Sequence, residues 1–217
     1  MSAGAASHAE LMDQVYRLQR HVYDVTRKYY LFGRDRMIDR LAIPQRGLGV
    51  SVIEIACGTG RNLARIRAVW PGAALFGLDI SAEMLKSARA RLPREVRLAV
   101  GDATAFDPQA LFGHGNFDRV VMAYCTSMIP EWRDAVALAC RLLAPGGSLH
   151  IVDFGDMAGL PGPLRGALRW WLARFHVSPR ADLAEAARGI AAAQGLLCEA
   201  TVFAGGYYRL VRVERPR

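Results

Sequence analysis

The chain has 217 residues, of which 52% are hydrophobic and 22% are charged, and its formal net charge is +8. This length predicts one domain with a sizeable core and excludes a second full domain. The stretch from Met1 to Glu10 lacks the basic and apolar parts of a signal peptide, and no apolar run approaches the roughly 20 residues that span a bilayer. We therefore expect a cytoplasmic protein.

Arginine dominates the positive charge. This excess suggests an anionic partner, either nucleic acid or an acidic membrane surface, although a coding bias towards arginine explains the same composition. Cys57, Cys125, Cys140 and Cys198 are far apart and form no C-x-x-C pair. We therefore expect reduced thiols, no disulfide framework and no metal site.

Apolar residues recur at helical spacing from Leu11 to Leu31 and predict a long amphipathic helix ahead of the core. Its basic residues lie largely off the apolar face, as in a helix that packs on the domain or one that lies at a lipid headgroup layer. A second, short helix is expected over 34–41, ended by Pro44. We therefore expect residues 1–45 to form a helical N-terminal cap and residues 46–217 to form the main domain.

The segment from Val50 to Asn62 predicts a buried strand, a glycine-bearing turn and the start of a helix. Glu54 places a carboxylate at the end of the strand, and Gly58 and Gly60 allow a ligand to approach the backbone closely. A carboxylate at this entrance would repel a pyrophosphate, and the dinucleotide fingerprint requires a small residue where Leu63 stands. The turn therefore favours a ligand that carries positive charge.

Helices and strands alternate after this turn. We expect helices over 62–70 and 81–92 and strands over 74–79 and 96–100. Asp79 and Asp102 come at the ends of these two strands. In an open parallel sheet such ends share one edge, so Glu54, Asp79 and Asp102 are expected to converge on one crevice, although a single carboxylate there is also typical of a helix cap. Asp79 has the spacing at which a carboxylate binds a ribose diol.

The second half of the chain predicts a strand over 117–124, a helix over 130–143 and a strand over 148–154. Tyr124 ends the first of these strands and is expected to face the reacting group. His150 lies in the middle of a strand, which is typical of a core histidine satisfied by a neighbour. A helix over 179–194 follows, and strands over 196–203 and 207–213 predict a terminal hairpin.

A basic, aromatic helix is expected over 163–175. Five residues share one stripe of it: Leu164, Leu168, Trp171, Leu172 and Phe175. Trp170 falls on the other side, among arginines, which is the pattern expected at a headgroup interface. Packing of the stripe on the core is the alternative.

The Glu54 strand end, Gly58-x-Gly60 and the run from Leu143 to Gly147 resemble motifs of the class I S-adenosylmethionine (SAM) methyltransferases. The resemblance implies a Rossmann-like α/β fold with a mostly parallel seven-stranded sheet, a C-terminal antiparallel hairpin and N-terminal helices. It implies SAM as cofactor and S-adenosyl-L-homocysteine as product. The implied cofactor-binding residues are Glu54, Ala56, Cys57, Gly58, Gly60, Arg61, Asp79, Ile80, Met84, Asp102 and Ala103.

Roles within this set also follow from the resemblance. Asp79 would bind the ribose hydroxyls, and Asp102 would bind the adenine amino group. Glu54 would face the amine of the methionine part, and Arg61 would face its carboxylate. Ala56 departs from the family, which has a glycine at this place, and narrows the entrance of the turn.

The segment from Tyr16 to Arg36, together with the ending 207–209, is similar to the diacylglycerylhomoserine N-methyltransferases of bacterial betaine-lipid synthesis. This similarity implies methylation of a homoserine amine to a trimethylated lipid headgroup, by a peripheral protein at the anionic inner face of the membrane. The implied catalytic residues are Tyr23, Tyr29, Tyr30 and Tyr124, and the implied carboxylate-binding residues are Arg27, Lys28 and Arg34.

Other functions remain open from the sequence. A quinone or other small-molecule methyltransferase is the nearest alternative, and a non-catalytic protein of the same fold is an alternative of another class. No N-P-P-Y or proline-cysteine motif follows the strand over 117–124, so a nucleic-acid partner is not expected.

Overall fold

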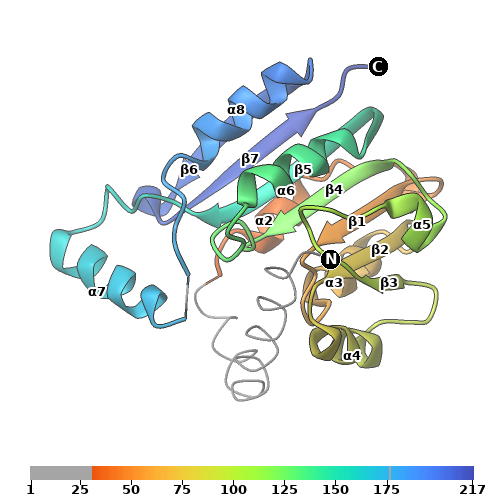
Figure 1. Ribbon diagram of the computed structural model, residues 1–217, viewed down its shortest axis with the longest axis horizontal. Coiled ribbons are helices and arrows are strands. Elements are labelled where there is room, and N and C mark those ends of the chain that lie inside the picture. The colour runs from red at the N-terminus through yellow and green to blue at the C-terminus, as the bar shows by residue number, and fades with distance from the viewer. Residues whose placement is uncertain (1–30, 176) are drawn as a thin grey trace.

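The computed structural model describes residues 31–175 and 177–217 (Figure 1). The amphipathic helix expected from Leu11 to Leu31 lies outside this range, apart from its last residue. The expected division into a cap over 1–45 and a domain over 46–217 stays a prediction for the same reason.

Seven strands form one sheet in the order β3-β2-β1-β4-β5-β7-β6. Their bounds are β1 (Ser51–Ile55), β2 (Ala74–Asp79), β3 (Arg97–Val100), β4 (Phe117–Ala123), β5 (Leu143–Phe154), β6 (Leu197–Phe203) and β7 (Tyr208–Glu214). The first five pair in parallel, whereas β7 runs antiparallel to both β5 and β6. The predicted mostly parallel sheet with a C-terminal antiparallel hairpin is confirmed.

Helices cover both faces of this sheet (Figure 1). They are α2 (Arg34–Asp39), α3 (Arg61–Val69), α4 (Ala82–Arg91), α5 (Pro108–Phe112), α6 (Trp132–Arg141), α7 (Gly162–Ala173) and α8 (Leu183–Ala193), with single 3-10 turns η1 (Gln45–Gly47) and η2 (Ala204–Gly206). Helix α5 is not predicted by the sequence pattern, because five residues are too few to show a period. It begins at Pro108, and the side chain of Asp107 caps it.

The core has one layer on each side of the sheet. Val52 on β1 belongs to one layer, which also contains Leu63 of α3, whereas its neighbour Ile53 belongs to the other, which contains Ala139 of α6. This alternation is the two-residue period of a strand buried on both faces. Burial of each such side chain contributes about 1.5–3 kcal/mol, so both layers stabilise the sheet.

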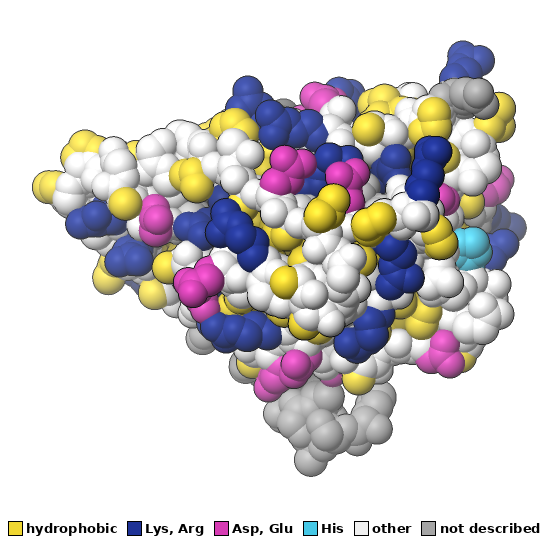
Figure 2. Space-filling view, turned by 90° about the horizontal axis from the view of Figure 1, so that it is seen from above, with side chains coloured by type: hydrophobic (Ala, Val, Ile, Leu, Met, Phe, Trp, Pro, Cys, Tyr) yellow, Lys and Arg dark blue, Asp and Glu magenta, His cyan; other side chains and the backbone are white. Residues whose placement is uncertain are grey.

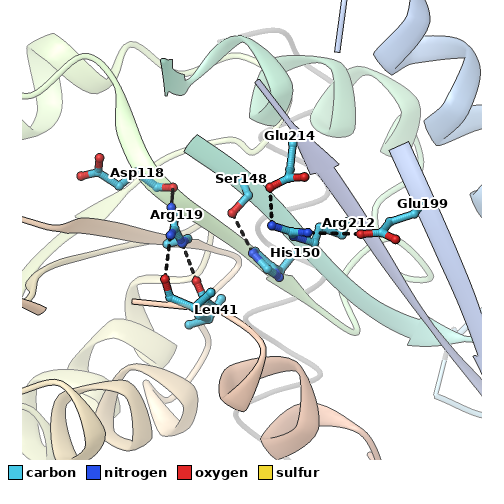
Figure 3. A network of polar contacts seen from close by, with 9 residues as sticks. Leu41, Asp118, Arg119, Ser148, His150, Glu199, Arg212 and Glu214 are labelled. Atoms are coloured by element: carbon cyan, nitrogen blue, oxygen red, sulfur yellow. Dashed lines mark hydrogen bonds and ion pairs between the residues drawn. The ribbon is translucent and has the colours of Figure 1, made fainter. Parts of the chain in front are cut away.

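Helix α2 is held against the C-terminal strands. Gly33 precedes it with φ 80°, and a Cβ there would lie 2.3 Å from Cε2 of Tyr208. Arg119 of β4 donates to the carbonyls of Leu41 (2.5 Å) and Ala42 (2.9 Å), which fixes the segment between α2 and β1 (Figure 3). The short helix predicted after residue 33 is thus confirmed.

His150 of β5 is a buried core residue, as predicted. One ring nitrogen, Nε2, lies 2.8 Å from the hydroxyl of Ser148 (Figure 3). Burial, followed by the nearby charges of Arg212 and Arg119, lowers the pKa of His150 to about 3. The ring is therefore neutral at physiological pH.

The apolar stripe predicted for α7 is only partly packed. Leu172 is 1% exposed, but Leu164 at the start of the helix is 49% exposed. Packing of the stripe on the core, which the sequence left open as an alternative, therefore holds for Leu172 but not for Leu164. In the part of the chain that the structure describes, no helix is long and apolar enough to cross a membrane.

Candidate active site

A cavity of about 330 Å³ lies beside the carboxyl ends of β1 and β4. These two strands are adjacent in the sheet although β2 and β3 separate them in sequence, so the strand order reverses between them. Such a reversal is where open α/β sheets bind ligands. The cavity is lined by Leu31, Arg34, Glu54, Ala56, Cys57, Gly58, Thr59, Arg61, Asn62, Ala64, Arg91, Ala123 and Tyr124.

The turn after β1 contains three left-handed residues. They are Ala56 (φ 56°), Gly58 (φ 54°) and Gly60 (φ 73°). A Cβ on Gly60 would lie 2.7 Å from Leu92, whereas nothing lies within 4 Å of a Cβ on Gly58. Gly60 is therefore needed for packing, and Gly58 leaves open space from which a ligand can approach the backbone.

Asp79 at the end of β2 is bonded to this turn. One carboxylate oxygen accepts a hydrogen bond from the backbone N–H of Gly58 at 2.7 Å, and the other accepts from the N–H of Ser81 at 2.9 Å. Asp79 thus shapes the turn in addition to its predicted role as the ribose-binding residue. That predicted role stays a prediction.

Glu54 carries a buried carboxyl group on the cavity wall. Its Oε1 accepts a hydrogen bond from the Asn62 amide at 2.6 Å, while Oε2 is buried and has no hydrogen-bond partner among the described residues. Burial raises the pKa of Glu54 to about 8, although the hydrogen bond from Asn62 and the charge of Arg34 oppose this shift. A buried carboxyl group in a cavity lining, with one oxygen unpaired among the described residues, fits a ligand ammonium group.

Arginines from three helices complete this end of the cavity. Arg61 forms a two-bond contact with Asp35 of α2, at 2.8 and 3.0 Å. Arg91 of α4 donates to the Thr59 hydroxyl at 3.2 Å, and Arg34 belongs to the same lining. The ion pair with Asp35 is not apparent from the sequence, and the predicted contact of Arg61 with a ligand carboxylate stays a prediction.

Tyr124 lines the cavity, with φ 56° and 3% of its surface exposed. Its hydroxyl donates to the carbonyl of Phe32 at 2.5 Å, and its ring packs edge-on against Phe154. Burial raises the pKa of Tyr124 well above its usual value, and burial does the same for the Cys57 thiol. Both groups are therefore neutral at physiological pH, and the predicted catalytic role of Tyr124 stays a prediction.

Several predicted binding residues do not line this cavity. Ile80, Met84, Asp102 and Ala103 follow β2 and β3 along the same edge of the sheet, as the parallel topology requires. Asp102 accepts from both the N–H and the hydroxyl of Thr104, which satisfies one of its oxygens locally. Their contacts with the adenosine part of a cofactor stay predictions.

The predicted residues of the N-terminal helix lie outside the described part of the chain. They are Tyr23, Arg27, Lys28, Tyr29 and Tyr30. No cluster of three or more potential metal ligands occurs among the described residues. All four cysteines are free thiols, as expected.

Asn62, Thr59 and Arg91 line the site, but the sequence interpretation gave them no role. A signal for Asn62 exists, because a side-chain amide in the first turn of a helix can reach back to a carboxylate at the preceding strand end. Arg91 lies 32 residues from Thr59, so only the tertiary structure brings the two together.

The central region of the chain matches a known protein family. Residues 52–147 match the family model described as "Methyltransferase domain". The central region of the chain is therefore similar to a methyltransferase domain. The predicted class of domain is therefore confirmed, and the cofactor of such a domain is SAM.

Two curated relatives show how far the sequence similarity extends. The demethylmenaquinone methyltransferase of Renibacterium salmoninarum is 30% identical over 154 residues, which is 70% of this chain and 61% of that protein. The trans-aconitate 2-methyltransferase of Methylobacterium radiotolerans is 36% identical over 99 residues, 46% of this chain and 36% of that one. The chain thus spans less than two thirds of the length of either relative.

Solved structures share the whole fold at low identity. A chain from the complex of the Haloferax volcanii Trm112 activator with a putative methyltransferase superposes with a TM-score of 0.72 at 17% identity, covering 94% of this chain and 97% of that one. The SAM complex of Haemonchus contortus phosphoethanolamine N-methyltransferase 2 gives 0.66 at 17% identity, covering 85% and 52%. The Rossmann-like methyltransferase fold is therefore confirmed.

The cavity of this methyltransferase domain fits the methionine part of SAM. The buried Oε2 of Glu54 suits its ammonium group, and the open space at Gly58 admits the ligand to the backbone. Arg61, which lines the same cavity, suits its carboxylate.

Proposed function

We propose that this chain is a SAM-dependent N-methyltransferase that converts the homoserine amine of diacylglycerylhomoserine to the trimethylated betaine headgroup. One observation carries the proposal. The segment whose sequence is similar to such enzymes, Tyr16 to Arg36, reaches the cavity, since its residues Leu31 and Arg34 belong to the lining. The Tyr124 hydroxyl also donates to Phe32 of that segment. The described end of this segment, from residue 31 onward, therefore contributes to the lining of the site.

The chemistry of the lining supports an amine acceptor. When bound, SAM supplies an electrophilic methyl group, and transfer needs an acceptor lone pair in line with it. Tyr124 and Cys57 are both neutral, and Glu54 is engaged with Asn62, so no strong base stands on the described part of the lining. A neutral amine needs none, because its own lone pair attacks the methyl group. The first two transfers then release a proton to solvent, and the third gives the quaternary ammonium without loss of a proton.

The charges support an acceptor that also carries a carboxylate. Arg34 lies on the cavity wall and is the predicted partner of the homoserine carboxylate. We propose that Arg27 and Lys28 assist it, and that Tyr23, Tyr29 and Tyr30 surround the methylated ammonium through cation–π contacts. The lipid substrate, the anionic inner membrane surface as partner and the absence of a nucleic-acid partner belong to the same proposal.

A quinone methyltransferase is the second candidate. The similarity to a demethylmenaquinone methyltransferase over 70% of the chain favours it. A quinone has neither an ammonium nor a carboxylate, so the arginines of the lining would have no role in its binding.

One assay separates the two candidates. The purified protein is incubated with methyl-labelled SAM and, in parallel, with diacylglycerylhomoserine and demethylmenaquinone in detergent micelles. We expect label in the homoserine lipid, and Arg34→Gln should raise its KM about tenfold or more without weakening SAM binding. Arg65→Gln, which changes an exposed arginine of α3, is the matched control and should leave KM unchanged. Label in the quinone alone, or in neither acceptor, contradicts the proposal.

A further inference from the structure

Helix α7 presents an apolar outer face to solvent. Five residues at helical spacing on this face are exposed, namely Pro163, Gly166, Ala167, Trp170 and Ala173. Trp170 is 64% exposed, and Leu164 beside the same end of the helix is 49% exposed. An exposed tryptophan on a continuous apolar face is unusual for a surface that meets only water.

The surroundings of this face are basic. The twenty residues from 161 to 180 contain four arginines and no acidic residue. Arg169 is exposed beside Trp170, and the guanidinium of Arg174 lies 5.1 Å from the centre of the Trp170 ring. Helix α7 forms the narrow end of the molecule in Figure 1, and the same end in Figure 2 shows mainly hydrophobic, Lys and Arg side chains.

The helix is anchored at both ends, which sets its position relative to the cavity. Before it, the N–H groups of Met157 and Gly159 donate to the carbonyls of Gly206 and Gly205, each at 2.9 Å. After it, the N–H of Ser178 donates to the carbonyl of Ser127 at 2.9 Å.

Arg180 strengthens the second anchor. It donates to the carbonyls of Thr126 and Ile129, each at 3.1 Å. Thr126 follows Tyr124 by two residues, so the exit of α7 is tied to the loop that follows Tyr124 of the cavity lining.

We propose that the outer face of α7 docks on an anionic lipid bilayer, with Trp170 at the headgroup level and Arg169 and Arg174 against the lipid phosphates. This proposal rests on the proposed lipid substrate and names the surface by which the enzyme reaches it. Tryptophan prefers the membrane interface because its ring is apolar and its N–H is polar. Arginines next to it add attraction to anionic lipid.

Docking on a bilayer explains why α7 carries arginines and leaves an apolar face exposed to solvent. Helix α7 has 12 residues and is too short to span a bilayer. Its apolar face of five small or aromatic residues suits insertion at the level of the headgroups. Because the exit of α7 is bonded to the loop after β4, docking of this helix holds a bilayer near the segment that follows Tyr124 of the cavity lining.

The test measures flotation of the full chain with lipid vesicles. We expect binding to vesicles containing phosphatidylglycerol and much weaker binding to pure phosphatidylcholine. Trp170→Ala should weaken binding to the anionic vesicles on the order of tenfold, and Arg169→Gln should weaken it about fivefold. The matched controls are Leu197→Ala, which removes a side chain that is 65% exposed on β6, and Arg94→Gln, which removes an exposed arginine between α4 and β3. Both should bind as the unaltered protein does.

Two results would overturn the docking surface: no preference of the unaltered protein for anionic vesicles, or equal binding by Trp170→Ala. Methylation of the homoserine lipid in detergent micelles is measured in parallel. The docking variants should keep this activity, since Trp170 and Arg169 lie outside the cavity lining. If vesicle binding follows the expected order but no lipid is methylated, the docking surface stands and the proposed substrate fails.

Discussion

The carboxylate of Asp79 accepts a hydrogen bond from the backbone N–H of Gly58 at 2.7 Å, and so joins the end of β2 to the turn after β1. Asp79→Ala should therefore abolish SAM binding and also lower the free energy of unfolding by about 1.5–3 kcal/mol, because it removes a charged acceptor from two backbone donors. Calorimetric titration with SAM and urea denaturation measure the two effects.

Asp107→Ala is a suitable control for this change. Asp107 also accepts from two backbone N–H groups, those of Gln109 and Ala110, but it caps α5 away from the cavity. Its loss should lower stability by about 1 kcal/mol and leave the affinity for SAM unchanged. Unchanged SAM affinity in Asp79→Ala would refute the assignment of Asp79 to the cofactor site.

The two glycines of the turn should respond differently to alanine. In Gly60→Ala, the new methyl group meets Leu92 at 2.7 Å in a left-handed backbone position, so the variant should lose about 2–4 kcal/mol of stability. In Gly58→Ala, the methyl group enters open space, so the stability loss should be about 1–2 kcal/mol, from the backbone alone.

The affinity for SAM should fall more in Gly58→Ala than in Gly60→Ala. The methyl group of Gly58→Ala occupies the approach to the backbone, and we expect affinity to fall at least about tenfold in a protein that remains folded. Thermal unfolding and calorimetry, run on both variants, provide the comparison. Full SAM affinity in Gly58→Ala would show that the ligand does not approach this side of the turn.

Glu54 should make SAM binding dependent on pH. Burial raises the pKa of Glu54 to about 8, so in the ligand-free protein the group is largely protonated at pH 7. A ligand ammonium group favours the ionised form, and binding should therefore release a proton. The apparent affinity should rise as pH increases from 6 to about 8 and then level off. Calorimetry at pH 7 in buffers of different ionisation enthalpy detects the proton.

The same group should influence the stability of the ligand-free protein. In the folded protein the pKa of Glu54 lies above its usual value of 4.5. The contribution of Glu54 to the free energy of unfolding is therefore fully present below about pH 4.5 and is lost as pH rises through about 8. Glu54→Gln keeps the shape and the contact with Asn62 but cannot ionise, and its unfolding free energy should lack this decline. Identical pH profiles for the two proteins would contradict the raised pKa of Glu54.

Ala56 is under backbone strain that glycine would relieve. Its φ of 56° lies in the left-handed region, which costs a residue with a Cβ about 1–2 kcal/mol. Glycine also loses more entropy on folding, so Ala56→Gly should raise stability by only about 0.5 kcal/mol. The same change at the exposed helical position Ala90 should lower stability by about 1 kcal/mol. Urea denaturation of both variants tests the sign, and a loss of stability in Ala56→Gly would contradict the strain.

The sequence by itself determined the elements of this protein and their order. Helical and strand periods are local, so the alternation of elements around Gly58 and Gly60 predicted the parallel sheet. The positions of Glu54 and Asp79 at the ends of their strands followed from it. The same reasoning missed α5, which is too short to show a period, and left open whether Leu164 and its stripe pack on the core. The roles assigned to residues outside the described range, including Tyr29, remain predictions.

Only the tertiary structure decided which partners these residues have. Gly58 binds Asp79, Arg61 pairs with Asp35, and the Tyr124 hydroxyl donates to Phe32 across 92 residues of sequence. Hydrogen bonds and ion pairs depend on distances between atoms that the chain brings together only when strands and helices pack. A period of two or of 3.6 residues states which face a side chain occupies, but not what stands opposite it.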